Sequence, residues 1–413
     1  MGDRLELVVD RLAADGEGIA TAPDGRVVFV RTGAPGDRVD VELTRVRSRS
    51  LHGFVQARLA DGPDRVPAFC PVVEQCGGCP WQGIDRAAQR AALSRHVSTL
   101  LSRAVGSPVE VPVEAVEPGE AWRATTRLHW QNGRIGFHEA RSPNVLDVAA
   151  CAVLAPPLPA LLTAVRRHLA PVLVGEGDLR LSARPGAASG TVHIETHGSA
   201  ALEAAARALA NDPACHGVVL AQAFGAALVL GQPFNEINGV PHQAQAFVQA
   251  HPVGAAALVR AVIDRLGPPP GPVLELYAGS GAFTLPLAEA GYAVTAVELQ
   301  GVAARSLAAE VERRKLPVQV VAGGAQRQPP GGFPWVILDP PRAGAPEAVA
   351  ALARRAGLRR MIYVACDPAT LARDVAHVIG RGWHLADARA FELFPHTGHV
   401  ETVVVLERHR MAP

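Results

Sequence analysis

Residues 272–298 read PVLELYAGSGAFTLPLAEAGYAVTAVE. The apolar first part predicts a buried strand, and Gly279 and Gly281 allow the chain to turn tightly into the apolar helix that follows. A second apolar run then ends at Glu298. Strand, glycine turn, helix and strand in this order are typical of a Rossmann-like α/β sheet, in which parallel strands alternate with helices.

The same loop indicates a ligand that carries a ribose. Glu298 stands 19 residues after Gly279, where a carboxylate can hold ribose hydroxyls. A dinucleotide fingerprint would have a third glycine at the position of Thr284, and a ligand without a pyrophosphate does not need it. S-adenosylmethionine therefore fits better than a dinucleotide. Taken alone, the loop could also be a tight packing turn.

A second candidate segment follows the apolar strand predicted over 335–338. It reads Asp339-Pro340-Pro341-Arg342. Ligands of open α/β sheets bind beyond the carboxyl ends of the strands, so Asp339 is expected in the same crevice as Glu298. Methyltransferases that act on exocyclic amines often have an aromatic residue after Asp-Pro-Pro, so Arg342 argues against amine methylation. The segment could also be a plain turn after a core strand.

Two further residues have candidate chemistry. Cys366 ends the strand predicted over 361–365, and the following Asp367-Pro368 predicts a helix N-cap and first helical position. The helix dipole would favour a thiolate there, although most lone cysteines are small buried hydrophobes. Glu401 precedes the apolar run 402–406. Burial would raise its pKa and suit a general base; the alternative is an ordinary carboxylate at a strand edge.

The N-terminal residues 1–60 alternate apolar and polar positions between turn signals, which predicts a small, OB-like β-barrel. Arg45, Arg47 and Arg49 lie two residues apart, so on a strand they would share one face. This face is either a phosphate-contacting stripe or a solvated surface. The net charge of +1 gives no global attraction to nucleic acid, so any such surface must be local.

The middle of the chain mixes helical and strand patterns, with an amphipathic helix predicted over 158–169. We therefore expect a β-barrel over 1–60, a central α+β domain that carries a cysteine cluster over 61–232, and the Rossmann-like domain over 233–413. The first residues make no signal peptide, and no apolar run approaches the roughly 18–20 residues of a membrane span. A cytoplasmic protein is expected.

Three of the six cysteines, Cys70, Cys76 and Cys79, fall within ten residues. A disulfide framework is not spaced in this way in a long chain of intracellular type. With a fourth cysteine, the Cys-x2-Cys core could bind zinc or a 4Fe-4S cluster, and spacing alone favours zinc. Cys215 is expected in a core.

Together these segments resemble the family of RNA uracil-5-methyltransferases, most closely the 23S ribosomal RNA members with an N-terminal TRAM domain and an iron–sulfur cluster. The resemblance covers nearly the whole chain and includes the glycine loop. The matching segments are Gly16–Asp37, Cys70-x5-Cys76-Gly77-Gly78-Cys79 with Cys151, Asp339–Arg342, Cys366–Pro368 and His399–Glu401. The resemblance implies a class I, S-adenosylmethionine-dependent methyltransferase that acts on carbon 5 of a uridine in RNA.

The resemblance also implies roles for individual residues. The Cys366 thiolate would add to C6 of the uracil, which turns C5 into a nucleophile for the sulfonium methyl group, and Glu401 would then remove the C5 proton. The implied cofactor contacts are Gln249, Tyr277, Gly279, Gly281, Glu298 and Asp339. The implied ligands of a 4Fe-4S cluster are Cys70, Cys76, Cys79 and Cys151.

The uridine would have to leave its stack to reach Cys366, so the RNA target is expected to be a loop or bulge. The TRAM-like segment and the cysteines favour 23S rRNA, and transfer RNA stays an alternative. Neither a membrane nor an obligate protein partner is expected.

The chain departs from the family at three places. Ala365-Cys366-Asp367-Pro368 replaces Ser-Cys-Asn-Pro, Ala282 replaces an Asn in the glycine loop, and Gln249-Ala250-His251 replaces Gln-x-Asn. The cofactor contact after the next strand is not assignable around 322–325. Two other hypotheses are a class I methyltransferase for another substrate, which gives Cys366 no task, and a non-enzymatic RNA-binding protein.

Overall fold

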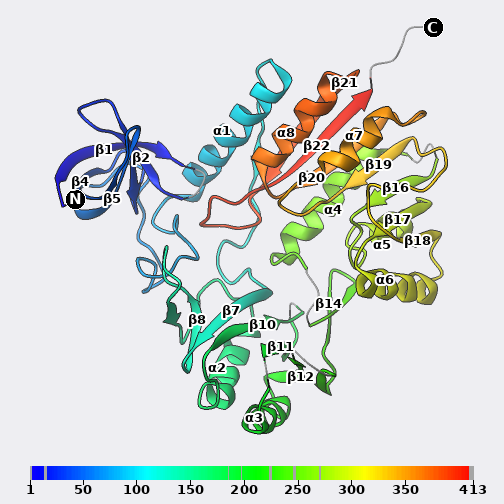
Figure 1. Cartoon of the computed structure of the whole chain (residues 1–413), viewed down its shortest axis with the longest axis horizontal. Helices are drawn as coiled ribbons and strands as arrows, with labels where there is room; N and C mark the ends of the chain where they lie inside the picture. The colour runs from blue at the N-terminus through cyan, green and yellow to red at the C-terminus, as the bar shows by residue number, and fades with distance from the viewer. Residues whose placement is uncertain are drawn as a thin grey trace.

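The computed structural model describes residues 2–13, 16–184, 186–196, 198–222, 226–244, 248–268 and 271–408. It contains a barrel, a seven-stranded sheet, a two-stranded hairpin and an eight-stranded sheet (Figure 1). Among the described residues, none of the helices combines the length and apolar character needed to cross a membrane.

The N-terminal strands close into a five-stranded barrel, as predicted. The order around it is β1 (Arg4–Leu12), β2 (Gly18–Thr21), β3 (Val27–Arg31), β5 (Ser50–Ala60) and β4 (Arg38–Val46). Alternate residues such as Val28, Val30, Val39 and Val41 are fully buried inside it. Closure pairs every strand on both sides, so the barrel has no free sheet edge.

The three arginines near the end of β4 do not share a strand face. β4 ends at Val46, so only Arg45 lies on it, whereas Arg47 and Arg49 lie in the turn before β5. All three side chains are exposed. The predicted stripe on one strand is therefore wrong, and the arginines instead surround a hairpin tip.

The chain then runs through the cysteine segment into helix α1 (Arg86–Val105). Asp85 caps this helix by accepting the N–H of Ala87 at 2.8 Å. Leu93, Val97 and Leu101 bury α1 in the same core as helix α8 (Pro368–Ile379). The short strand β6 (Val113–Glu114) pairs with β21 of the eight-stranded sheet. This segment, which we expected in the central domain, thus packs on the C-terminal sheet.

The middle of the chain forms the seven-stranded sheet. Helices α2 (Leu158–Leu169) and α3 (Ala200–Ala210) cover one of its faces, and α2 has the predicted bounds. Cys215 is buried in this core, as expected. The sheet order is β13 (Leu228–Gly231), β12 (Cys215–Gln222), β11 (Gly190–Thr196), β10 (Glu176–Ser182), β7 (Thr125–Gln131), β8 (Arg134–His138) and β9 (Val145–Asp147). The hairpin of β14 (Phe234–Ile237) and β15 (Val240–Gln243) follows.

The C-terminal sheet is the predicted α/β sheet, with one addition. Its order is β18 (Val318–Ala322), β17 (Val294–Glu298), β16 (Val273–Leu276), β19 (Trp335–Leu338), β20 (Arg360–Ala365), β22 (Glu401–Arg408), β21 (Trp383–Phe391) and β6. The first five strands are parallel, and β22 runs antiparallel to both of its neighbours.

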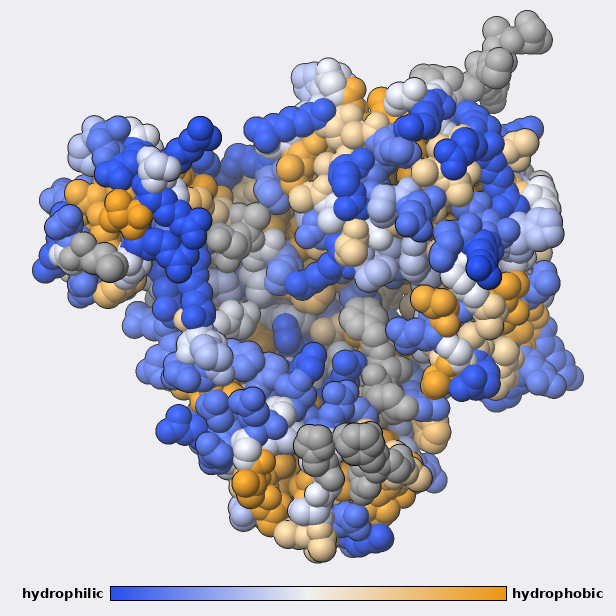
Figure 2. Space-filling view, viewed as in Figure 1, coloured by the Kyte–Doolittle hydropathy of each residue, from blue (hydrophilic) through white to orange (hydrophobic). Residues whose placement is uncertain are grey.

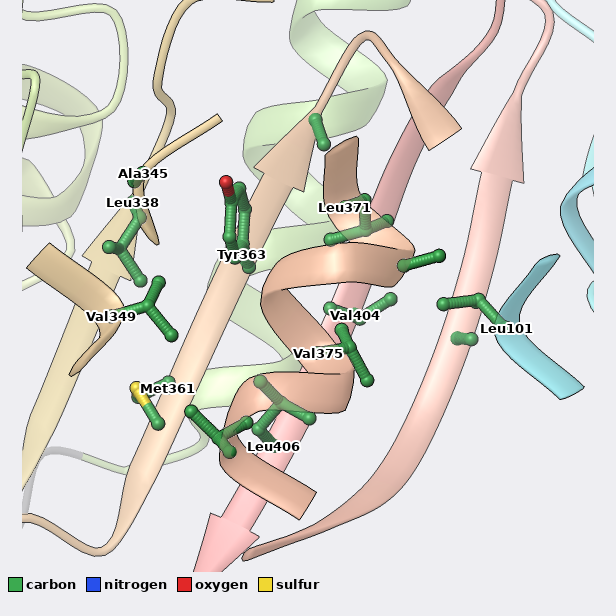
Figure 3. Packing of buried hydrophobic residues seen from close by; sticks show 14 of the residues in the cluster. Leu101, Leu338, Ala345, Val349, Met361, Tyr363, Leu371, Val375, Val404 and Leu406 are labelled. Carbon is green, nitrogen blue, oxygen red and sulfur yellow. The ribbon is translucent and has the colours of Figure 1, made fainter. Parts of the chain in front are cut away.

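Helices cover both faces of this sheet. One core contains residues of α4 (Pro252–Leu266), α5 (Thr284–Glu289) and α6 (Gly301–Arg314). The other contains residues of α1, α7 (Pro346–Arg354) and α8. Figure 3 shows part of the second core, where Leu371 and Val375 of α8 pack near Val404 and Leu406 of β22. The carboxyl ends of the parallel strands therefore meet at one edge, which is where ligands of such sheets bind.

Candidate active site

The glycine loop leaves open space beside Gly279. Gly279 has φ +56° and Gly281 has φ +97°, both in the left-handed region that favours glycine. A Cβ on Gly281 would lie 2.6 Å from Cδ1 of Leu307, whereas a Cβ on Gly279 would meet nothing within 4 Å. Gly281 is thus required for packing, and Gly279 faces the space that a ligand could fill.

Glu298 lies directly under this loop. Its Oε2 accepts the N–H of Gly279 at 2.8 Å, and its Oε1 accepts the N–H of Gln300 at 2.6 Å. The side chain is 8% exposed. The predicted carboxylate and the predicted glycine are therefore in direct contact at the ends of β17 and β16.

A buried carboxyl that we did not single out, Glu275 on β16, lies beneath the same loop. The Thr284 hydroxyl donates to Glu275 Oε2 at 2.7 Å, and both side chains are buried. Burial raises the pKa of Glu275 to about 8, and the charges of Asp339 and Glu298 act in the same direction. Thr284, which stands where a dinucleotide fingerprint has glycine, thus anchors the strand to the helix that follows it.

Asp339 and Arg342 belong to the loop after β19. Asp339 is half-buried, and burial raises the pKa of its carboxyl to about 7. Arg342 is exposed, and its backbone carbonyl accepts the hydroxyl of Thr370 at 3.1 Å. α8 therefore holds the Pro-Pro loop in place beside the end of β20.

Cys366 directly follows β20, which ends at Ala365, and directly precedes Asp367, the N-cap of α8. Asp367 caps the helix as predicted, because its side chain accepts the N–H groups of Ala369 and Thr370 at 3.0 and 2.9 Å. The expected thiolate is not favoured, however. Burial raises the pKa of Cys366 to about 11, and the charges of Glu401 and Asp339 add to this effect. The helix dipole and Arg342 do not outweigh desolvation and two carboxylates, so the neutral thiol predominates.

Glu401 is the first residue of β22 and is 2% exposed. Burial raises the pKa of its carboxyl well above the ordinary value, as predicted, and Asp339 adds to the rise. A side-chain hydrogen bond with Gln249 and the charge of Arg342 oppose it. Among the described residues, Glu401 Oε2 has no hydrogen-bond partner. A buried carboxyl with a free oxygen is well suited to accept a proton.

The structure thus brings together Cys366, Glu401, Asp339 and Gln249, all of which we singled out from the sequence. Arg342, which we had used only to argue against amine methylation, is the cation that acts on both Cys366 and Glu401. The sequence did contain one indication that Arg342 belongs to the site: it directly follows two prolines, which stiffen the loop after β19.

Tyr277 lies apart from this group. Its backbone is left-handed, with φ +65°. Its side chain packs against the core on the α7 and α8 side, where the charges of Asp374 and Glu347 add to the burial that raises the pKa of its phenol. The predicted cofactor contact therefore stands at the end of β16 but on a different side from Glu401.

His251 explains one departure from the family pattern. Its Nδ1 accepts the N–H of Gly254 at 3.4 Å and so caps α4, a task that an Asn side chain could also perform. Its ring stacks on Trp122 with the centroids 5.4 Å apart. The N–H of Ala124 donates to the carbonyl of Ala250 at 2.8 Å. These contacts fix Ala250 and His251, the two residues that follow Gln249, and the Gln249 side chain hydrogen-bonds to Glu401.

The four cysteines predicted as ligands lie in one neighbourhood. The charges of Cys70, Cys76 and Cys151 act on the thiol of Cys79, whose pKa burial raises to about 12. The guanidinium of Arg123 opposes this rise and acts on Cys76 and Cys151 as well. All four are half-buried free thiols. Within the described part of the chain, no group of three or more His, Cys, Asp or Glu side chains is arranged to hold a metal ion.

Relatives of known activity resemble the chain along nearly all its length. A 23S rRNA (uracil(1939)-C(5))-methyltransferase from Chromohalobacter salexigens is 33% identical over 97% of this chain and 89% of that protein. The 23S rRNA (uracil(1939)-C(5))-methyltransferase from Pseudomonas putida is 32% identical over 98% of this chain and 94% of that protein. The chain belongs to the RNA uracil-C5 methyltransferase family.

Two family descriptions match parts of this uracil-C5 methyltransferase chain. The TRAM domain matches residues 1–55, which include the barrel strands β1 to β4, and tRNA (Uracil-5-)-methyltransferase matches residues 332–409, which include Asp339, Cys366 and Glu401. The crystal structure of the Pyrococcus abyssi tRNA (uracil-54, C5)-methyltransferase in complex with S-adenosyl-L-homocysteine has the same fold. It is 23% identical, with a TM-score of 0.77 over 97% of this chain and all of that one.

Proposed function

We propose that this chain transfers a methyl group from S-adenosylmethionine to carbon 5 of a uridine in 23S rRNA, with Cys366 as nucleophile and Glu401 as base. One observation carries the proposal. The buried Glu401 lies close enough to Cys366 for its charge to act on the thiol, at the edge of the sheet where the parallel strands have their carboxyl ends. The ribosomal RNA substrate follows the names of relatives that match almost end to end. Transfer RNA, the substrate in the name of the structural neighbour, is the alternative.

Cys366 starts the reaction when its thiol gives up its proton to solvent and the thiolate sulfur forms a bond to C6 of the uracil. The electron pair of the C5–C6 double bond moves toward C5, which becomes a nucleophile. Arg342 favours the thiolate, because it is the cation that lowers the pKa of Cys366. When bound, S-adenosylmethionine supplies a methyl group that is electrophilic because it is attached to a sulfonium.

Glu401 completes the reaction by removing the proton from C5. The electron pair of the C5–H bond re-forms the C5–C6 double bond, the C6–S bond breaks, and the Cys366 thiolate leaves. The raised pKa of Glu401 makes its carboxylate a stronger base than an exposed glutamate. Its Oε2, without a hydrogen-bond partner among the described residues, is the atom that would accept the proton.

Six residues would hold the cofactor. Gly279 faces open space, and Glu298 contacts the Gly279 N–H from below, which supports a ribose site at this loop. Asp339 lies between this loop and Cys366, since its charge acts on both Glu275 and Cys366. The full proposed set is Gln249, Tyr277, Gly279, Gly281, Glu298 and Asp339.

The RNA would enter between the barrel and the two larger sheets. Figure 2 shows a hollow in the face between these parts, with hydrophilic residues on its rim. A uridine must leave its base stack to reach a half-buried Cys366, which supports a loop or bulge as the target. A cytoplasmic location is part of this proposal, because the relatives named above act on the ribosomal RNA of bacteria, which have no nucleus.

RNA that contains 5-fluorouridine tests the mechanism. After methyl transfer, C5 carries fluorine in place of the hydrogen that Glu401 would remove as a proton. Fluorine cannot leave as a cation, so the enzyme should stay covalently attached to the RNA through Cys366. The Cys366→Ala variant should form no adduct and transfer no methyl group. Unchanged methylation by Cys366→Ala would overturn the mechanism. Mapping 5-methyluridine in RNA from a deletion strain separates ribosomal from transfer RNA.

We also propose that Cys70, Cys76, Cys79 and Cys151 hold a 4Fe-4S cluster with a structural or RNA-positioning role. Two observations support it: the charges of Cys70, Cys76 and Cys151 all act on the thiol of Cys79, and Gly78 donates its N–H to Cys76 Sγ at 3.4 Å. Iron, sulfide and zinc analysis after anaerobic purification tests this. Cys79→Ser should lose iron and sulfide, and the core variant Cys215→Ala should retain them. Bound zinc without iron would refute the cluster.

For the organisation of the chain we propose a TRAM barrel over 1–60, a central RNA-binding domain over 61–232 and a methyltransferase domain over 233–413. One change to this division is supported. Because α1 packs against α8 and β6 pairs with β21, residues 86–114 belong structurally to the methyltransferase domain, although they precede it in the sequence.

A further inference from the structure

The loop that leads to Glu401 is fixed from outside the catalytic sheet. It runs from 392 to 400, between β21 and β22. Arg86, Gln89 and Arg90 lie three and four residues apart on α1, so they share one face of the helix. All three contact this loop. A helix from the N-terminal half of the chain therefore holds the segment that carries the proposed base.

The first attachment is at Glu392, which is 1% exposed. Its Oε2 lies 2.8 Å from Nη2 of Arg86 and 3.1 Å from Nη1 of Arg90. Two cations on one buried carboxylate compensate its desolvation. This pairing fixes the beginning of the loop.

The second attachment joins Gln89 to His396, both buried. Gln89 Oε1 accepts the N–H of His396 at 2.9 Å, and Gln89 Nε2 lies 3.3 Å from His396 Nδ1. Nε2 of the histidine lies 3.1 Å from the carbonyl of Gly119. A neutral ring with its proton on Nε2 satisfies both neighbours, because Nδ1 then accepts and Nε2 donates.

His396 has a backbone conformation that needs such support. Its φ of +68° lies in the left-handed region, which non-glycine residues adopt mainly where neighbouring contacts hold them. The carbonyl of His396 accepts the N–H of Trp81 at 3.0 Å, and Gln89 Nε2 donates to the carbonyl of Ile84 at 2.7 Å. Gln89 thus ties the bend at His396 to the segment that follows Cys79.

We propose that Gln89 and His396 are positioning residues that set Glu401 for removal of the C5 proton. The inference rests on the proposed function. Four residues lie between His396 and Glu401. A displacement of about 1 Å at a reacting group can reduce a rate by about 100-fold. Cys366 is held separately, by β20 and the cap of α8. Loosening the loop should therefore slow the last chemical step and spare the first.

The Gln89→Leu variant tests this separation. Its kcat on ordinary RNA should fall about 10- to 100-fold with KM for RNA changed less than about twofold, and the covalent intermediate should accumulate. Adduct formation with 5-fluorouridine RNA should proceed at nearly the wild-type rate, since it requires no proton removal. Ser94→Ala removes a different hydrogen bond of α1, from Oγ to the Val111 carbonyl at 2.6 Å, and should leave both rates unchanged.

The outcomes separate the two proposals. Equal loss of turnover and adduct formation, or no loss of either, would overturn the positioning role. If Gln89→Leu does not fold, His396→Asn carries the same test, because asparagine tolerates the left-handed backbone and α1 stays intact. Failure of the proposed function would appear instead in the wild-type enzyme, as the absence of both methyl transfer and adduct.

Discussion

The sulfur of Cys366 stands in surroundings that oppose its own activation. Burial and two carboxylates raise its pKa to about 11, and Arg342 is the cation that opposes them. Because only the thiolate attacks, the rate of adduct formation should increase with pH between about 7 and 10. Arg342→Gln removes the opposing charge, so the pKa of Cys366 rises further. At pH 8 the rate should then fall about two- to tenfold, because Arg342 is exposed and water screens its charge.

Single-turnover adduct formation with saturating 5-fluorouridine RNA measures this effect over the pH range. Arg342→Lys is the matched control, since it keeps the charge and should keep most of the wild-type profile. A pH profile that is the same in Arg342→Gln and in the wild type would show that Arg342 does not act on the ionisation of Cys366.

The cap of α8 explains why aspartate can replace the usual asparagine after Cys366. Either side chain can accept the N–H groups of Ala369 and Thr370. Asp367→Ala should therefore destabilise the protein by about 1 kcal/mol, and Asp367→Asn by only a few tenths. Denaturant unfolding of the three proteins measures the difference. Equal loss of stability in both variants would mean that the carboxylate charge, and not the cap, is what α8 requires.

The two glycines of the ligand loop should respond differently to alanine. At Gly281 the new Cβ would press against Leu307 and the φ of +97° would be strained, so Gly281→Ala should lose about 1–3 kcal/mol of stability. At Gly279 the Cβ would enter open space, and Gly279→Ala should cost about 1 kcal/mol. Calorimetric titration with S-adenosylmethionine should nevertheless show weaker binding by Gly279→Ala. Equal affinity in Gly279→Ala and the wild type would place the ligand elsewhere.

The parts of this fold that depend on residues close together in the sequence could be predicted from the sequence. The helix over 158–169 has the expected bounds, and the rule on carboxyl ends predicted Asp339 near Glu298, in agreement with the action of both charges on Glu275. The packing of α1 on α8 could not be predicted, because it joins segments more than 260 residues apart. The pKa of Cys366 could not be predicted either. It depends on burial and on charges that only the tertiary structure brings together.

The molecule as a whole has almost no net charge, so its attraction to RNA must come from local surfaces. Arg45, Arg47 and Arg49 are exposed around the tip of the hairpin between β4 and β5. This barrel lies at one end of the molecule, at the side of the hollow in its face (Figures 1 and 2). An RNA that enters by this hollow, as proposed, would extend onto the barrel.

Replacing these three arginines by alanine should therefore weaken RNA binding in a way that depends on salt. Each lost phosphate contact should reduce the slope of log affinity against log salt by about 0.7–0.9. The affinity for S-adenosylmethionine should not change, because the barrel contributes nothing to the glycine loop. Filter binding at several salt concentrations measures the slope. A control that replaces Arg103, Arg207 and Arg354, exposed arginines on α1, α3 and α7, removes the same charge elsewhere. If both triple variants lose the same affinity, net charge rather than the barrel surface attracts the RNA.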